Sequence, residues 1–170
     1  MSIGIGGHTL PQNGRTNDWL TPPDILRALG EFDLDPCCPP VMPWRTAAYM
    51  IHDDSGDGLV ADWYGRVWCN PPYGEGTAAW LRKMAEHGRG TALVFARTET
   101  AMFRDHVWPF ATAALFLHGR IHFHGTDGRR AKGNAGGPSV LLAYGALDAA
   151  ILKGSGIAGK YLEVNAPEGK

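Results

Sequence analysis

Short apolar segments of strand length alternate with segments of helical periodicity over the first hundred residues of this chain. A hydroxyl side chain at Thr21 precedes two prolines, which predicts the start of a helix that ends at Gly30. The other elements expected in this half are strands at 32–35, 66–69 and 91–95 and a helix at 77–87. Because a helix that follows a strand returns the chain to the same end of the sheet, this alternation predicts parallel strands.

The second half of the chain follows a different pattern. A helix is expected over 101–107, before Pro109. Three apolar segments, at 114–117, 121–123 and 140–144, are then separated by loops without helical periodicity, which is typical of antiparallel strands. We therefore expect an α/β fold whose mixed sheet is parallel at its centre and antiparallel at one edge.

The length of 170 residues, of which 44% are hydrophobic, is suited to one domain with one core. We expect this domain over 18–153. Residues 1–17 are rich in Gly, Asn and Thr without apolar periodicity and are expected to form a flexible arm, while 154–170 are expected to form a C-terminal tail. The segment 39–58 is rich in proline and then acidic, so we expect an irregular excursion there.

The charges are nearly balanced, with 16 Lys and Arg against 17 Asp and Glu and a formal net charge of -1. This balance argues against a protein that holds nucleic acid through its overall field. The glycine-rich segment 119–137 is a local exception, because its only acid is Asp127 and its basic residues are Arg120, Arg129, Arg130 and Lys132. We predict a basic loop there that binds DNA phosphates, with a solvated hairpin tip as the alternative.

The three cysteines are Cys37, Cys38 and Cys69. An odd number with two adjacent members is poor material for disulfides and indicates a reducing cytoplasm. The N-terminus lacks the pattern of a signal peptide, and no stretch approaches about 18 consecutive apolar residues, so we expect neither secretion nor membrane insertion.

Four consecutive residues, Asn70, Pro71, Pro72 and Tyr73, directly follow the expected strand 66–69. Two prolines end the strand and supply no N–H, so they favour a rigid turn whose carbonyls are fixed in place. An asparagine oxygen and a fixed carbonyl can accept hydrogen bonds from an aromatic amine, whose nitrogen is otherwise a weak nucleophile, and a tyrosine ring can stack on a base. The alternative is a plain strand exit before a helix.

Further motifs follow one another in an order that makes this pattern more specific. They are WLTPP (19–23), FDLDPCC (32–38), Asp57-Gly-Leu, Asp62-Trp63, VWCNPPYG (67–74), FARTET (95–100), GRIHF (119–123) and PSV (138–140). Together they resemble the phage DNA N6-adenine methyltransferases, which are Dam-like amino-group methyltransferases. The resemblance implies a Rossmann-like fold, S-adenosylmethionine as methyl donor and adenine in double-stranded DNA as acceptor, in the cytoplasm of a bacterial host. We expect a monomer or weak dimer.

The resemblance also implies roles for single residues. Asn70 to Tyr73 would form the catalytic motif. Contacts with the cofactor are implied for Trp19, Thr21, Pro22, Asp35, Pro36, Cys37 and Asp62, and Arg97 would lie near a phosphate or the catalytic cleft. Asp35, Asp62 and Asn70 are all expected at or just beyond strand ends, where ligands bind in such sheets. For Asp35, Asp62 and Arg97 a structural or surface role is the alternative.

Two other interpretations stay open. One is a methyltransferase of RNA adenine or of protein glutamine, because both present a planar nitrogen to the same motif. The other is a DNA-binding module that keeps the fold without turnover. A metal site at His118, His122 and His124 is not expected, because no cysteine or acidic cluster completes it and methyl transfer needs no metal.

Overall fold

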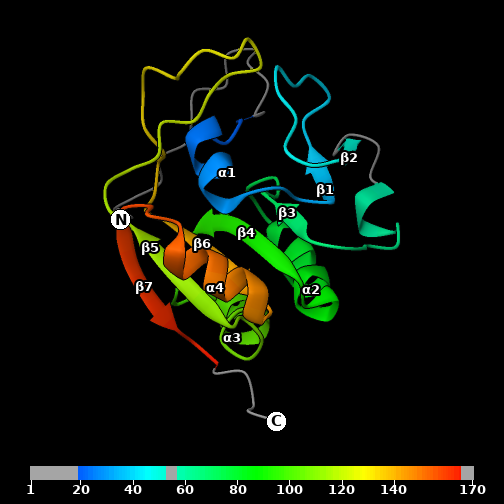
Figure 1. Ribbon diagram of the computed structural model, residues 1–170, viewed down its shortest axis with the longest axis vertical. Helices are drawn as coiled ribbons and strands as arrows, with labels where there is room; N and C mark the ends of the chain where they lie inside the picture. Colours follow the sequence, from blue (N-terminus) through cyan, green and yellow to red (C-terminus); the bar gives the residue numbers. More distant parts are fainter. Residues whose placement is uncertain (1–18, 53–56, 166–170) are drawn as a thin grey trace, which may run out of the picture.

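The computed structural model describes residues 19–52 and 57–165, so the arm expected at 1–17 lies outside the described residues. Within them, seven strands form one sheet in the order β2-β1-β3-β4-β6-β5-β7 (Figure 1). The strands are β1 (Leu34–Cys38), β2 (Tyr49–His52), β3 (Val67–Cys69), β4 (Gly90–Phe95), β5 (Ala113–Leu117), β6 (Ser139–Tyr144) and β7 (Gly159–Glu163). Strands β2, β1, β3 and β4 pair in parallel, whereas β4–β6, β6–β5 and β5–β7 pair antiparallel. The predicted mixed α/β sheet is confirmed, and its parallel part reaches from the centre to the β2 edge.

Helices cover both faces of this sheet. They are α1 (Pro23–Leu29), α2 (Thr77–His87), α3 (Ala101–His106) and α4 (Ala146–Gly154), with a short 3-10 helix, η2, at Asp57–Leu59. Side chains alternate along β4, so Leu93 belongs to the core under α1 and α4, while Ala92 and Val94 belong to the core under α2 and α3. None of the helices in the described ranges is long and apolar enough to cross a membrane.

Both edge strands lie where the sequence predicts irregular chain. β2 falls within 39–58, and β7 falls within the expected tail at 154–170, where it pairs with β5 from Gly159 to Glu163. Each edge strand has one neighbour and is half-exposed, so it lacks the apolar pattern that marks a buried strand. The helix α4 that precedes β7 is likewise absent from the sequence prediction.

The segment 121–123 is not a strand, contrary to the sequence prediction. Ile121 and Phe123 are buried, and their carbonyls accept hydrogen bonds from the N–H groups of Ala135 and Ala131. These bonds fold 119–137 into an ordered hairpin, which we call the basic hairpin. Its apolar residues anchor a loop to the core instead of extending the sheet.

A buried ion pair joins the amino-terminal end of β3 to α4. The Arg66 guanidinium lies 2.9 Å from a carboxylate oxygen of Asp148, which also accepts a 3.0 Å hydrogen bond from the Thr91 hydroxyl. The same guanidinium donates to the carbonyls of Leu29, at the end of α1, and of Glu31, just beyond it. One side chain therefore holds α1, α4 and the sheet together.

Candidate active site

The connections between the parallel strands run to opposite sides of the sheet from β1 and from β3. From β1 the chain continues to β2 on one side, whereas from β3 it continues to β4 on the other. Ligands of open α/β sheets bind in the crevice beyond the carboxyl ends of such neighbouring strands. Here those ends are in contact, because the sulfur atoms of Cys37 on β1 and Cys69 on β3 lie 3.8 Å apart. The sheet therefore brings the predicted residues Asp35, Pro36 and Cys37 to the same place as Asn70.

The side chain of Asn70 has a defined orientation at this position. Its amide nitrogen donates to the Trp19 carbonyl and to the Thr21 hydroxyl, both at 3.3 Å. A carbonyl can only accept, so the nitrogen must face Trp19 and the oxygen must face the other way. That oxygen accepts a 3.4 Å hydrogen bond from the Tyr73 hydroxyl.

The two prolines have different surroundings. The Pro72 carbonyl accepts a 2.8 Å hydrogen bond from the Thr77 hydroxyl, whose oxygen in turn accepts one from the Gly74 N–H. This turn leads directly into α2. Pro71 is buried, and within the described part of the chain no donor reaches its carbonyl. The Asn70 oxygen and the Pro71 carbonyl are thus two acceptors on consecutive residues.

Two stacked aromatic rings, those of Tyr73 and Phe95, lie beside Asn70, and we call this pair the aromatic wall. The ring of Tyr73 stacks on Phe95 at the end of β4, with centroids 4.4 Å apart, and meets the edge of Phe123 at 6.3 Å. Burial raises the pKa of the Tyr73 phenol well above its ordinary value, so its hydroxyl stays protonated and able to donate. Sequence reasoning missed Phe95 and Phe123 as site residues, because both have the pattern of core positions in apolar segments.

Asp35 is 3% exposed, and its carboxylate is engaged by the protein itself. One oxygen accepts from the Cys37 N–H at 3.1 Å, and the other accepts from the hydroxyl of Thr46. The carboxylate therefore ties the end of β1 to the loop that follows it. This geometry favours the structural alternative for Asp35, and its contact with a cofactor stays a prediction.

Asp62 does not follow a strand, contrary to expectation. The preceding residues form η2 and a turn, and Asp62 itself is exposed. The segment is held by its neighbour Trp63, whose indole N–H donates to the Gly58 carbonyl at 2.8 Å, and by Lys83 of α2, which donates to the Leu59 carbonyl at 2.7 Å. The structure thus gives Asp62 a position on a surface turn.

Close packing against β1 explains why the Asp57-Gly-Leu motif has a glycine at position 58. A Cβ atom at this buried position would lie 1.8 Å from the Pro36 carbonyl oxygen on β1, a backbone atom that cannot move aside. Gly58→Ala is therefore expected to lower the free energy of unfolding by about 1–3 kcal/mol, as overpacking does. Urea denaturation measures this, with Gly133→Ala as control because a Cβ there meets nothing within 4 Å. Equal stability of the two variants would contradict the close approach of η2 to β1.

The basic hairpin packs against the segment before α1 and against the loop after β1. His124 pairs with Leu20 through two backbone hydrogen bonds of 2.9 Å, and its ring meets the Trp44 ring edge-on at 5.4 Å. In Figure 1 the hairpin (yellow) and the loop after β1 (cyan) extend from the same end of the sheet. Segments from three parts of the sequence therefore meet at this end.

Most of the cationic side chains predicted to contact DNA do not hold other parts of the fold in place. Arg129, Arg130 and Lys132 are exposed on the hairpin, whereas Arg120 donates to the Ala135 carbonyl within it. Arg97 is exposed, and its guanidinium lies 5.8 Å from the centroid of the Phe95 ring. Arg97 thus stands beside the aromatic wall.

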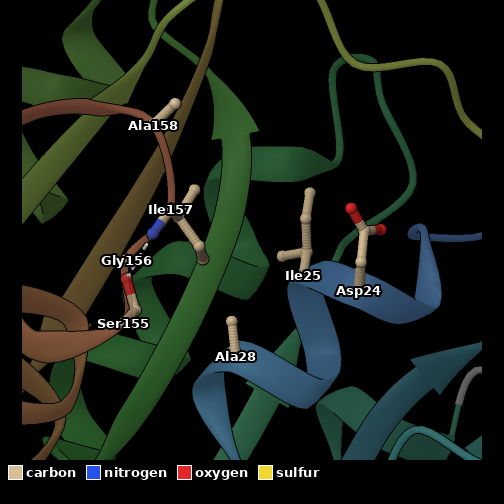
Figure 2. A pocket seen from close by; sticks show the side chains of 7 residues that line it. All are labelled: Asp24, Ile25, Ala28, Ser155, Gly156, Ile157 and Ala158. Atoms are coloured by element: carbon tan, nitrogen blue, oxygen red, sulfur yellow. Dashed lines mark hydrogen bonds between the residues drawn. The ribbon is translucent and has the colours of Figure 1, made fainter.

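A groove of about 270 Å³ lies elsewhere, between α1 and the turn after α4. Figure 2 shows Asp24, Ile25 and Ala28 of α1 facing this turn, which runs from Ser155 to Ala158. Its lining has one carboxylate and otherwise aliphatic or small side chains. It contains none of the residues predicted to bind cofactor or base.

Among the described residues, no group of three or more His, Cys, Asp or Glu side chains is placed to hold a metal ion. Comparison of the chain with protein-family models, with curated proteins and with solved structures gave no match.

Proposed function

We propose that this chain is an S-adenosylmethionine-dependent DNA methyltransferase that modifies the N6 amine of adenine. The observation that carries the proposal is the oriented Asn70 oxygen beyond the end of β3, followed directly by the Pro71 carbonyl, to which no donor of the described residues is bonded. An amine with two N–H groups can donate one hydrogen bond to each. Such bonds increase the electron density on a nitrogen whose lone pair is delocalised into the ring.

The residues at the crevice suit the proposed cofactor. The Trp19–Pro22 segment is bonded to Asn70, and the end of β1 touches β3 through Cys37, so the residues that would hold the cofactor flank the acceptor pair. Trp19, Pro22, Pro36 and Cys37 are the residues of this set that we expect to contact it most directly, and a contact with Asp35 stays a prediction. When bound, S-adenosylmethionine supplies a methyl group on a sulfonium, which is already an activated leaving group.

The protein contributes orientation and hydrogen bonding. Asn70 and Pro71 hold the amine, and the wall of Tyr73 and Phe95 gives the base an aromatic surface on which to stack, worth roughly 1–3 kcal/mol per base. The Asn70 oxygen has two lone pairs, so it can accept from an amine while Tyr73 still donates to it. Positioning of the two reactants accounts for the rate, and no covalent enzyme intermediate is needed.

Transfer of an isotopically labelled methyl group tests this function. The purified protein is incubated with labelled S-adenosylmethionine and, separately, with duplex DNA, RNA and a protein extract. We expect label in duplex DNA, at the N6 position of adenine after digestion and chromatography. Label in RNA or in protein instead would replace the proposed acceptor by one of the alternatives.

A DNA-binding module without turnover is the second candidate, and one observation favours it. Tyr73 already stacks on Phe95 and donates to Asn70, so the protein's own side chains fill part of the site. Calorimetry with S-adenosylmethionine separates the two candidates. Failure to bind the cofactor, together with retained DNA binding, would favour the module.

The basic hairpin is expected to bind DNA phosphates. Simultaneous replacement of three of its exposed cations, Arg129, Arg130 and Lys132, by Ala should weaken DNA binding and leave cofactor binding unchanged. The slope of log affinity against log salt should flatten by about 0.9 for each phosphate that the variant no longer neutralises. Fluorescence anisotropy with labelled duplexes at several salt concentrations measures both quantities.

A variant with the same loss of charge elsewhere is the control for this prediction. Arg82, Arg104 and Lys160 are exposed outside the basic hairpin, and their joint replacement by Ala should leave the salt slope nearly unchanged. If both triple variants behave alike, the hairpin is not the site that binds DNA.

A further inference from the structure

Thr21 has an unexpected partner. Its position before two prolines suggests an N-cap, yet α1 begins at Pro23, and the cap residue Pro22 makes no side-chain hydrogen bond. Thr21 is 2% exposed, and its hydroxyl oxygen instead accepts from the Asn70 amide at 3.3 Å. The hydroxyl is therefore directed to the amide nitrogen of Asn70 and not to its own helix.

The backbone around Thr21 is held on both sides. The preceding residue, Leu20, is 1% exposed and exchanges two backbone hydrogen bonds of 2.9 Å with His124 of the basic hairpin. The following residue, Pro22, has a restricted backbone, and its carbonyl accepts a hydrogen bond from the Ile25 N–H at 3.1 Å. The Thr21 hydroxyl oxygen thus has a fixed position beside the Asn70 amide.

The placement of the Asn70 amide matters because a carboxamide has two chemically different ends. Rotation of the Asn70 amide by a half turn exchanges its oxygen and nitrogen, and the terminal torsion of asparagine is broad. The reversed amide would present N–H groups to a substrate amine, which is itself a donor, and the acceptor pair would no longer exist. The Trp19 carbonyl opposes this rotation, because it can only accept a hydrogen bond. The Thr21 hydroxyl can bond to either end of the amide, so its part is to restrain the amide at the place where Trp19 discriminates between the two ends.

We propose that Thr21 is a positioning residue that holds the Asn70 amide in place, so that the Trp19 carbonyl can fix its productive orientation. The inference rests on the proposed function, because it assigns a purpose to the oxygen of Asn70. In this proposal Thr21 acts on Asn70, whereas the sequence resemblance implies that Thr21 contacts the cofactor. The hydroxyl acts through Asn70, and the Trp19 carbonyl assists it.

Thr21→Val keeps the β-branched shape and removes the acceptor, so it tests this role. We expect kcat to fall about tenfold, which is the effect of removing one hydrogen bond, while KM for DNA and the affinity for S-adenosylmethionine change less than about twofold. Thr21→Ser restores a hydroxyl and should recover most of kcat. Normal kcat together with a large loss of cofactor affinity in Thr21→Val would overturn the proposal.

A second measurement does not depend on turnover. In the ¹⁵N-labelled protein without cofactor or DNA, the side-chain amide protons of Asn70 should shift and exchange faster with solvent in Thr21→Val than in the parent. Thr46→Val is the matched control, because it removes another buried threonine hydroxyl that bonds to Asp35 instead. Asn70 signals that are unchanged in Thr21→Val would overturn the inference.

The two experiments separate the inference from the proposed function. A parent protein that methylates none of DNA, RNA and protein contradicts the proposed function. Altered Asn70 signals in that same protein would still support the control of the amide by Thr21.

Discussion

Asn70→Ala is expected to lower kcat for methyl transfer about a hundredfold or more and to leave the affinity for S-adenosylmethionine nearly intact. The substitution removes the acceptor that is aligned by Trp19 and Thr21, and the loss of one aligned polar group in a transition state typically costs about 10²–10³ in rate. Single-turnover kinetics with labelled cofactor gives the rate, and calorimetry gives the cofactor affinity.

Asn165→Ala is the control for this experiment. The Asn165 amide also donates to two backbone carbonyls, those of Trp108 and Ala111, but it lies after β7 and away from the crevice. Its replacement should reduce stability without reducing kcat. A similar loss of cofactor binding and kcat in Asn70→Ala would indicate that Asn70 is structural, and equal turnover in Asn70→Ala and the parent would remove it from the mechanism.

Arg66→Ala is expected to have the largest effect on stability, a loss of about 3–5 kcal/mol in the free energy of unfolding. Asp148 is 1% exposed, and the substitution leaves its carboxylate buried without its ion-pair partner. It also removes the donors to the carbonyls of Leu29 and Glu31 and the packing of the guanidinium over the Phe32 ring at 4.2 Å. Urea denaturation of the variant and the parent measures the loss.

The pH dependence of this loss identifies its cause. Burial raises the pKa of Asp148, and Arg66 opposes that rise. In Arg66→Ala the larger opposing charge is gone and only the weaker charge effect of Arg89 remains, so the folded state should bind a proton at Asp148 more readily than the unfolded state does. The penalty should therefore be largest at neutral pH and shrink as pH falls toward the titration range of the carboxyl.

An exposed ion pair provides the control for Arg66. Arg104→Ala removes the partner of Asp105 on the surface of α3, where solvent screens the interaction, and should change stability little. A loss in Arg66→Ala as small as that in Arg104→Ala, or one that is independent of pH, would show that the buried pair does not hold α1, α4 and the sheet together.

Local sequence patterns were sufficient for three of the four parallel strands, β1, β3 and β4. The apolar segments that form β1, β3 and β4 and the periodicity of α2 are predictable because buried elements repeat apolar residues over neighbouring positions. The position of Asn70 directly after a strand follows from the same pattern, since two prolines end the strand. Edge strands β2 and β7 contradict the prediction because their side chains are half-exposed and mixed.

The interactions that define the candidate site were decided by the tertiary structure. Thr21 and Asn70 are 49 residues apart, and the Thr46 hydroxyl reaches Asp35 only because the loop after β1 folds back. The stacking of Tyr73 on Phe95 likewise requires β3 and β4 to pair. Local propensity and periodicity depend on residues a few positions apart, whereas these interactions depend on which strands are neighbours. The sequence alone thus determined which residue types stand at the strand ends, and only the packing of the sheet decided that Thr21 faces Asn70 while Asp35 is used within the fold.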